Sequence, residues 1–324
     1  MPIVLSEGLP AAARLRGEGI SVTEVPNRGD GGDPLRDPRP LRVALLNLMP
    51  SKERTETQIA RMLGGAGLPV ALTLVLPDGY RPRTTAAAHI ERHYRPWSAI
   101  RRRRFDGLIV TGAPVETLPF EAVGYWDELT RILDWSRNAV GRGLFICWAG
   151  QAALKHRHRV DKRPLARKAF GVFRQSVVAP GEPALAGFGA TFPVPVSRHT
   201  EVARSDLPVG RGLSVLAESR ESGLCLVEDR PYRSLYMFNH LEYDADTLDA
   251  EYRRDLAASR AVAPPCNSYP GDDPTRPPGN VWRAHGQRFF ANWLCSMAWR
   301  RDDRARRDVG FERCGAVPEP RRAA

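Results

Sequence analysis

A cysteine at the end of an apolar run is the first residue in this sequence that could do chemistry. Residues 143–154 read Gly-Leu-Phe-Ile-Cys-Trp-Ala-Gly-Gln-Ala-Ala-Leu, a pattern that predicts a strand, a sharp turn and a helix. The turn would lift the Cys147 thiol off the carboxyl end of a sheet, beside helix N–H groups that favour a thiolate and a developing oxyanion. The alternative is a structural cysteine that ends a buried strand, because free cysteine is among the most buried residue types.

A second stretch, residues 235–244, could supply the base that such a nucleophile needs. It reads Leu-Tyr-Met-Phe-Asn-His-Leu-Glu-Tyr-Asp, so a predicted strand ends at His240 and the Glu242 carboxylate can reach the imidazole. A thiol needs a base to react at neutral pH, and the base needs a third group to fix its tautomer and stabilise its cation. We therefore predict Cys147, His240 and Glu242 as a catalytic set, against the alternatives of a core histidine and an exposed carboxylate.

The elements that must position these residues alternate along the first half of the chain. Strands are predicted at 42–48, 71–76, 107–111 and just before Cys147, with helices at 55–63, at about 121–140 and after Cys147. This alternation predicts an α/β fold of the flavodoxin-like kind, with a mostly parallel sheet covered by helices on both faces. Ligands bind such sheets at the carboxyl ends of the strands, so the loops after Asn47, Thr111 and Cys147 should open together.

The second half has shorter β-like runs, and the two ends of the chain differ from the middle. We expect strands at 170–178, 190–196, 213–217, 224–227 and 235–238, and helices at about 244–258 and 282–300. Residues 1–40, rich in Pro, Gly and charge, are expected to form a loosely structured lead-in with a short helix near Leu9 to Arg16. A single catalytic domain should span 41–300, followed by a basic, flexible tail at 301–324.

Composition narrows the class of protein. The chain has 324 residues and 42% hydrophobic content, enough for a substantial core. It shows no leader and no apolar run long enough to cross a bilayer, so we expect a cytoplasmic protein without membrane contact. Its five scattered cysteines form no CxxC pair, so disulfides, structural zinc and other metal sites are not expected.

The net charge of +11 raises the question of nucleic-acid binding. The basic runs at 101–104, 157–167 and 300–307 contain no interleaved aromatic residues and no known reader motif, so we interpret them as solvated faces without a nucleic-acid partner. A basic rim would also attract a polyanionic small molecule.

In its ordered motifs the sequence resembles the homoserine O-acyltransferase family of methionine biosynthesis, of the type with a class I glutamine amidotransferase-like fold. The resemblance covers about residues 41–300. The matching blocks are Leu45-Leu-Asn-Leu-Met-Pro50, Asp106-Gly-Leu-Ile-Val-Thr-Gly-Ala-Pro114, Ile146-Cys-Trp-Ala-Gly-Gln-Ala-Ala153, Ser197-Arg-His199, His240-Leu-Glu-Tyr-Asp244 and Trp282-Arg-Ala-His-Gly286.

The resemblance implies a ping-pong acyl transfer with no bound cofactor. The cysteine matching Cys147 takes the acyl group from an acyl-coenzyme A as a thioester, and the histidine matching His240, supported by Glu242, activates the homoserine hydroxyl. Backbone N–H groups are expected to meet the oxyanion, one from Trp148 and one from the loop around Ser51 and Lys52.

The family's homoserine contacts fall on Lys168, Ser197 and Arg254. Arg254 can hold an α-carboxylate in a bidentate fork, and the other two can supply further donors. The substrates implied are L-homoserine and acyl-coenzyme A, and the oligomer implied is a homodimer.

One residue bears on the choice of acyl donor. Members with glutamate at the position of Glu116 are associated with acetyl-coenzyme A, and members with glycine there with succinyl-coenzyme A. A carboxylate in the acyl pocket fills space and repels the free carboxylate of a succinyl group. The resemblance therefore implies acetyl transfer, with a succinyl donor as the alternative.

The chain departs from the family pattern at Asn239 and Leu241, where Gly and Pro or Ser are usual, and at Cys266-Asn-Ser-Tyr-Pro270. A related hydroxy-amino acid therefore stays open as acceptor. A glutamine amidotransferase would share the fold but usually has glycines close to its cysteine, where this chain has Trp148. A non-catalytic binding module would be expected to have lost one of the three catalytic residues.

Overall fold

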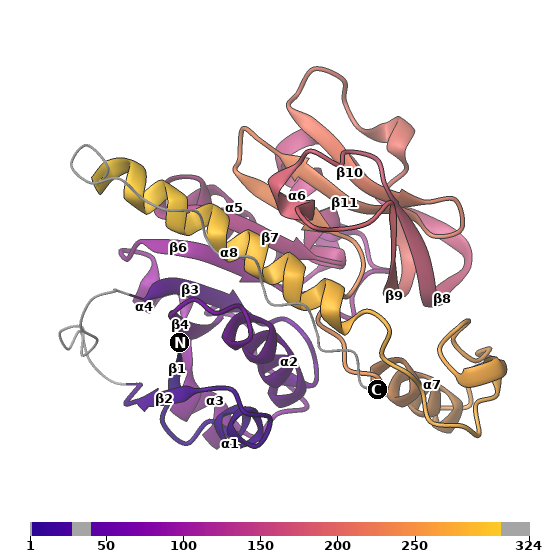
Figure 1. The fold of residues 1–324 in the computed structure, drawn as a ribbon, viewed down its shortest axis with the longest axis horizontal. Helices are drawn as coiled ribbons and strands as arrows, with labels where there is room; N and C mark the ends of the chain where they lie inside the picture. Colours follow the sequence, from indigo (N-terminus) through magenta and orange to yellow (C-terminus); the bar gives the residue numbers. More distant parts are fainter. Residues whose placement is uncertain (1, 28–39, 306–324) are drawn as a thin grey trace.

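The computed structural model describes residues 2–27 and 40–305, and its described strands form one 12-stranded sheet in the order β2-β1-β4-β3-β6-β7-β12-β11-β10-β8-β9, with β5 paired to β4 (Figure 1). The parallel half contains β1 (Ile3–Ser6), β2 (Val22–Val25), β3 (Leu41–Leu46), β4 (Val70–Leu76), β5 (Tyr94–Pro96), β6 (Phe105–Val110), β7 (Val140–Ile146) and β12 (Ser234–Met237).

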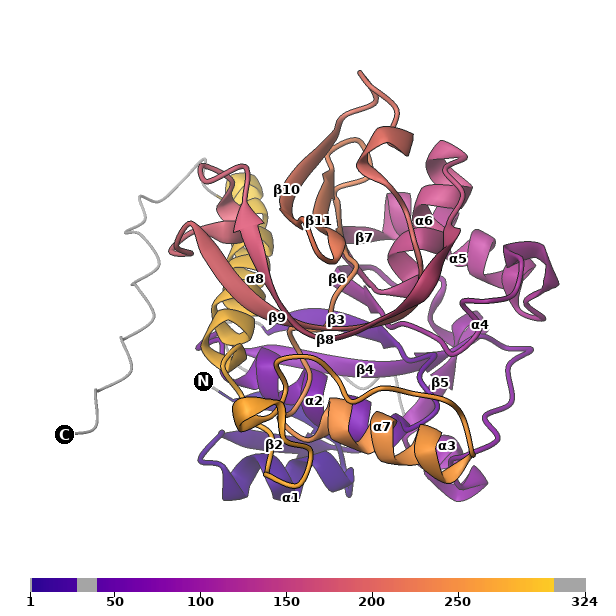
Figure 2. The same ribbon diagram turned by 90° about the vertical axis from the view of Figure 1, so that its right-hand side faces the viewer.

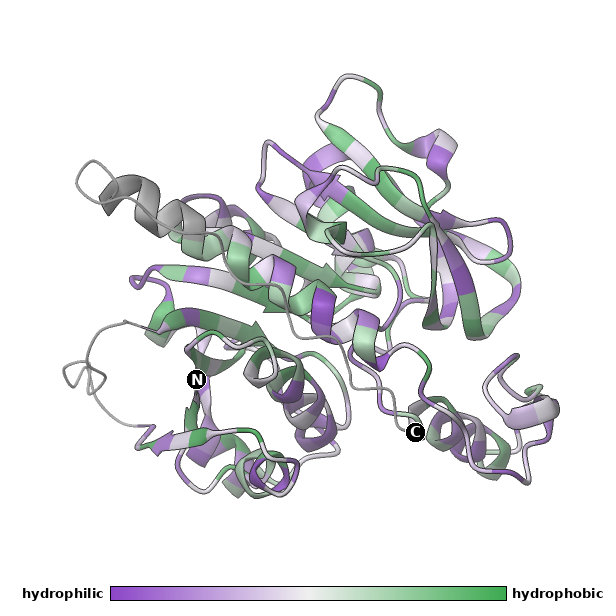
Figure 3. Ribbon diagram, viewed as in Figure 1, coloured by the Kyte–Doolittle hydropathy of each residue, from purple (hydrophilic) through white to green (hydrophobic). Residues whose placement is uncertain are grey.

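Helices cover both faces of this parallel half, as predicted. Successive residues of β3 point to opposite cores: Val43 and Leu45 pack with α2 (Lys52–Gly64) and α8 (Arg283–Ala305), whereas Ala44 and Leu46 pack with α5 (Trp126–Ala139) and α6 (Trp148–His158). This two-sided burial explains why the strands are continuous apolar runs without alternation. Figure 3 shows the hydrophobic residues concentrated along these central strands.

The second half of the sheet is antiparallel and includes the two longest strands, β8 and β9. It contains β8 (Arg163–Val177), β9 (Thr191–Glu201), β10 (Leu213–Ser219) and β11 (Gly223–Asp229). β8 and β9 form a curved ribbon (Figure 2), and helix α7 (Thr247–Ala257) follows β12 in sequence. In residues 2–27 and 40–305 no helix is both long and apolar enough to cross a membrane.

The predicted loose lead-in is wrong for most of its length. β1 pairs in parallel with both β2 and β4, and α1 (Pro10–Gly17), close to the expected short helix, lies between β1 and β2 in the chain. The physical reason is that Ile3, Leu5 and Leu15 are buried in the core beside α2. The first sheet strand is therefore at the start of the chain and not at residue 41.

Smaller differences between the predicted and the observed elements lie elsewhere in the chain. The polar segment before β6 contains α3 (Ala87–His93), β5 and α4 (Trp97–Ile100), which the residue pattern did not predict, and α5 begins at Trp126 after a short 3-10 turn. Helix α8 continues to Ala305, into the expected tail. The rest of that tail, residues 306–324, and the segment 28–39 lie outside the described residues.

Candidate active site

Cys147 lies at a sharp turn between β7 and α6, at the carboxyl end of its strand. Its backbone has φ 53° and ψ −120°, a conformation that non-glycine residues rarely adopt and that is concentrated at functional sites. The Cys147 N–H donates to the Met237 carbonyl on β12 (2.7 Å), and the Cys147 carbonyl accepts from the Gly150 N–H (3.0 Å). The strand-turn-helix geometry expected at this residue is therefore present.

Gly112, in the loop after β6, gives the thiol its space. A Cβ atom added at Gly112 would lie 3.2 Å from the Cys147 Cβ and 3.8 Å from its Sγ. Two of the three loops expected at this edge of the sheet thus meet at the cysteine. The side chain of Met49, from the third loop, is 3.7 Å from the same added atom.

His240 and Glu242 form a buried pair beside this turn. The His240 Nδ1 and the Glu242 Oε1 are 2.7 Å apart, and the Tyr243 ring stacks on the imidazole with 4.1 Å between centroids. Burial works to lower the pKa of His240, but the Glu242 carboxylate and the Cys147 sulfur together raise that pKa well above its usual value. The environment of His240 therefore favours its imidazolium form.

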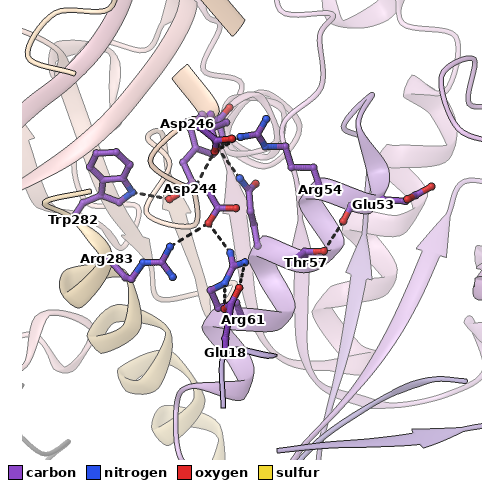
Figure 4. Close-up of polar contacts among 12 residues, drawn as sticks. Glu18, Glu53, Arg54, Thr57, Arg61, Asp244, Asp246, Trp282 and Arg283 are labelled. Atoms are coloured by element: carbon purple, nitrogen blue, oxygen red, sulfur yellow. Dashed lines mark hydrogen bonds and ion pairs between the residues drawn. The ribbon is translucent and has the colours of Figure 1, made fainter. Parts of the chain in front are cut away.

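A polar cluster fixes the loop that carries the pair (Figure 4). The Arg61 guanidinium of α2 donates to Asp244 (2.6 Å) and, through two further N–H groups, to Glu18 (2.5 and 2.7 Å). The Trp282 indole donates to the Tyr243 carbonyl (2.8 Å). Because Glu18 belongs to the N-terminal segment, that segment helps to hold the loop after β12.

A cavity of about 1180 Å³ opens above Cys147 and His240. Its wall brings together the residues predicted to bind homoserine and to select the acyl donor, although they come from four separate segments. These are Lys168 on β8, Ser197 on β9, Arg254 on α7 and Glu116 in the loop after β6.

Two carboxylates of α7 that sequence reasoning missed organise this wall. Glu251 accepts hydrogen bonds from the Ser197 hydroxyl (2.5 Å) and the Tyr243 hydroxyl (2.9 Å), and its Oε2 is 3.7 Å from the Lys168 ammonium nitrogen. Asp255, one helical turn on, lies 3.6 Å from the same nitrogen. Their spacing, four residues apart around Arg254, was a signal in the sequence, because such residues share one face of a helix.

Arg254 is already paired in this structure. Its Nε and Nη2 both donate to Asp255 Oδ1, at 3.0 and 2.9 Å. Its side chain is 58% exposed, so the guanidinium keeps free donors toward the cavity for a carboxylate.

Glu116 is held against β9 by its carboxylate. The Oε2 atom accepts from the His199 N–H (2.9 Å) and is 3.4 Å from the Thr200 hydroxyl oxygen. The Glu116 carbonyl accepts from the Lys162 ammonium (2.5 Å). The charged group is thus fixed at the cavity wall.

Of the two residues expected to donate an N–H group to the oxyanion, Trp148 is suitably placed and Lys52 is not. Trp148 is the first residue of α6, and the N–H groups of a first helical turn have no partner within the helix. Lys52 is unsuited to the role in this structure, because its N–H donates to the Pro50 carbonyl (3.1 Å) and its buried ammonium donates to the Asn47 (2.7 Å) and Met49 (3.0 Å) carbonyls. Lys52 therefore shapes the loop after β3 and does not point a free donor at the thiol.

The described part of the chain holds no group of three or more His, Cys, Asp or Glu side chains that could bind a metal ion.

Comparisons with known proteins identify the family of the chain. Residues 2–303 match the family model described as homoserine O-succinyltransferase. The homoserine O-acetyltransferase of Novosphingobium aromaticivorans is 51% identical over 294 residues, which cover 91% of this chain and 95% of that protein. The homoserine O-acetyltransferase of Brucella canis is 50% identical over 298 residues, covering 92% and 95%.

Solved structures support the fold. A glutamine amidotransferase from Thermotoga maritima has a TM-score of 0.51 at 12% identity, covering 80% of this chain and 97% of that one. A glutamine amidotransferase from Methylobacillus flagellatus has a TM-score of 0.51 at 13% identity, covering 80% and 94%. The class I glutamine amidotransferase-like fold is thus confirmed, and with it the predicted resemblance. Because residues 2–303 match the family model and the two relatives are about 50% identical to the chain, the chain belongs to the homoserine O-succinyltransferase family of homoserine acyltransferases.

Proposed function

We propose that this protein transfers an acetyl group from acetyl-coenzyme A to the hydroxyl of L-homoserine and gives O-acetyl-L-homoserine for methionine biosynthesis. The observation that carries the proposal is the placement of Cys147, at a helix N-terminus, in one cavity with His240 and with a fixed set of amino-acid-binding charges. The relatives named homoserine O-acetyltransferase support it.

In the first half-reaction the Cys147 thiolate attacks the acetyl carbonyl of the donor. The carbonyl oxygen becomes an oxyanion, which the first-turn N–H groups of α6, including that of Trp148, stabilise. When the tetrahedral species collapses, the C–S bond to coenzyme A breaks and the imidazolium of His240 protonates the leaving thiolate. The products are free coenzyme A and an acetyl thioester on Cys147.

In the second half-reaction His240 takes the proton of the homoserine hydroxyl while its oxygen attacks the thioester. The new C–O bond forms, and Cys147 leaves as a thiolate. Glu242 stabilises the imidazolium through the 2.7 Å contact with Nδ1 and fixes the tautomer whose Nε2 faces the substrate.

The amino acid would be held by the charges of the β8, β9 and α7 wall. Its carboxylate fits the free donors of Arg254 and the ammonium of Lys168. Its ammonium fits the carboxylate of Glu251, which Ser197 and Tyr243 orient. A related hydroxy-amino acid of similar length would use the same contacts and is the second candidate acceptor.

Glu116 supports acetyl over succinyl as the donor group. Its carboxylate lies at the cavity wall, held by β9, where the distal carboxylate of a succinyl thioester would meet a like charge. We also propose a homodimer that acts in the cytoplasm, as the family resemblance implies. Light scattering during gel filtration tests the first part, since a monomer mass would contradict it.

The test is a product assay by mass spectrometry with purified protein. Acetyl- and succinyl-coenzyme A are each combined with homoserine, serine and glutamine, with Cys147→Ala as control. O-acetylhomoserine formed by wild type alone supports the proposal. Ammonia released from glutamine without any acylated product would contradict it and favour an amidotransferase.

A further inference from the structure

Arg198 is a buried cation that the proposed mechanism does not use. It lies on β9 between Ser197 and His199, and only 2% of its surface is exposed. A fully buried guanidinium is costly unless its surroundings compensate it. Its contacts therefore indicate what it does.

The hydrogen bonds of Arg198 go to uncharged oxygens. Nη1 donates to the Asn239 side-chain oxygen (2.6 Å) and to the Phe238 carbonyl (3.3 Å), and Nη2 donates to the Ser222 carbonyl. The Nε atom is buried without a hydrogen-bond partner among the described residues. The positive charge is thus held in place without being neutralised by a bonded carboxylate.

Arg198 holds the segment Phe238–Asn239, which lies in the chain directly after Met237 and directly before His240. Just before it, the Met237 carbonyl accepts from the Cys147 N–H (2.7 Å); just after it, the His240 N–H donates to the Pro195 carbonyl on β9 (2.9 Å). The cysteine, this segment and β9 are thus connected by successive hydrogen bonds. Burial lowers the pKa of Arg198, and negative charge at Cys147 is the largest opposing influence.

We propose that Arg198 is a positioning residue that locks the Phe238–Asn239 segment, and with it His240, against the Cys147 turn and supplies a fixed positive charge to the thiolate. The charge would act twice in the reaction proposed above, on which this inference rests. It favours the attacking thiolate in the first half-reaction and the departing thiolate in the second. Since Arg198 is buried and is not among the residues that line the cavity, it acts through Cys147 and His240.

Several ionisable groups besides Arg198 interact with Cys147 or face its cavity, and any pH dependence includes them. Two of these groups are the α7 carboxylates of Glu251 and Asp255, which line the cavity wall. The others are His240 and Tyr243 in the loop after β12, Glu242 behind His240, Glu116 in the loop after β6, Arg167 and Lys168 on β8, His199 on β9, Arg254 on α7, and Glu221 and Arg260 in loops. A test of Arg198 must therefore change its charge and leave these groups in place.

The readout is the pH profile of Cys147 alkylation by iodoacetamide, followed by peptide mass mapping so that other cysteines are not counted. No acyl donor or acceptor is present, so the result does not depend on which acyl group the enzyme transfers. Asn239→Asp places a carboxylate of the same shape on Arg198 Nη1, and Arg198→Met removes the charge. Both variants should shift the pH midpoint of Cys147 alkylation upward and slow alkylation at neutral pH by about ten- to a hundredfold.

Two matched variants separate charge from shape. Asn239→Ala removes the same hydrogen-bond acceptor without adding charge, and Arg198→Lys keeps the charge; both should have a midpoint near that of wild type. Arg198→Lys should still turn over more slowly, because it loses the contact with Phe238. The proposal is overturned if the midpoint of Asn239→Asp equals that of Asn239→Ala, a comparison that holds even if Arg198→Met does not fold.

Discussion

Replacement of Glu116 tests how the cavity chooses its acyl group. Glu116→Gln keeps the shape of the side chain and removes its charge, whereas Glu116→Gly removes both. In the structure the carboxylate is fixed by the His199 N–H at 2.9 Å, so it cannot easily turn away from a second carboxylate. Charge and volume should therefore contribute separately to donor choice.

Coulomb's law gives the order of magnitude of the charge effect. At a separation of about 5 Å and an effective dielectric constant of about 20–40, a succinyl carboxylate and the carboxylate of Glu116 would repel by about 1.5–3 kcal/mol. This energy corresponds to about ten- to two-hundredfold in kcat/KM for succinyl-coenzyme A. Glu116→Gln should recover this factor, and Glu116→Gly should add space for the longer chain.

The assay is the release of coenzyme A with each donor at saturating homoserine. The ratio of kcat/KM for the succinyl and acetyl donors should rise from wild type to Glu116→Gln and again to Glu116→Gly. Thr117 lines the same cavity in the next position, and Thr117→Ala serves as a control in which the ratio should change little. An unchanged ratio in Glu116→Gly would refute the reasoning.

Three further predictions concern the site and its support. Burial lowers the pKa of Lys52 to about 8 from 10.5, so the unfolded chain binds more protons than the folded one between these pH values. Relative to Lys52→Met, wild type should therefore gain up to about 3 kcal/mol in free energy of unfolding as pH rises from 8 to 10.5. Urea unfolding at several pH values measures this, and a constant difference in free energy of unfolding between the two proteins would contradict it. Glu242→Gln removes the charge that supports the His240 imidazolium and should lower kcat about a hundred- to ten-thousandfold, with a lower pKa for His240 by NMR; a wild-type rate would exclude the role given to Glu242. Gly112→Ala places a methyl carbon 3.2 Å from the Cys147 Cβ and should slow acylation about ten- to a hundredfold with little change in thermal midpoint, whereas a wild-type acylation burst would show that the loop simply moves aside.

Most of the fold could be predicted from the sequence because the central strands carry their own signal. Apolar runs such as 42–48 and 107–111 end in loops with Pro and Gly, and the structure places a strand at each. Strands β1 and β2, at four residues each, are too short to show a period, and only the pairing of β1 with β4 makes them part of the sheet. The Pro and Gly residues that favour a loose lead-in are concentrated at residues 26–34 of the sequence, most of which lie outside the described residues, whereas residues 3–25 contain fewer.

The site was predictable where chemistry depends on residues near one another in sequence. Cys147 with its turn, and His240 with Glu242, are each a local pattern. Glu251 was missed because its role depends on which face of α7 meets the cavity, and that is set by packing. Arg198 lies in the Ser197-Arg-His199 motif, but the sequence indicates no role for it, since an arginine on a strand is usually a surface residue and its burial cannot be read from the sequence.

The most direct test of the account is the intact mass of the protein after brief mixing with acetyl-coenzyme A in the absence of acceptor. We expect an increase of one acetyl group in wild type, none in Cys147→Ala, and loss of the increase when homoserine is added. Succinyl-coenzyme A in a parallel sample should give little adduct. No covalent adduct from either donor, in protein that nevertheless forms O-acetylhomoserine, would contradict the thioester on Cys147 and require direct transfer between the two substrates.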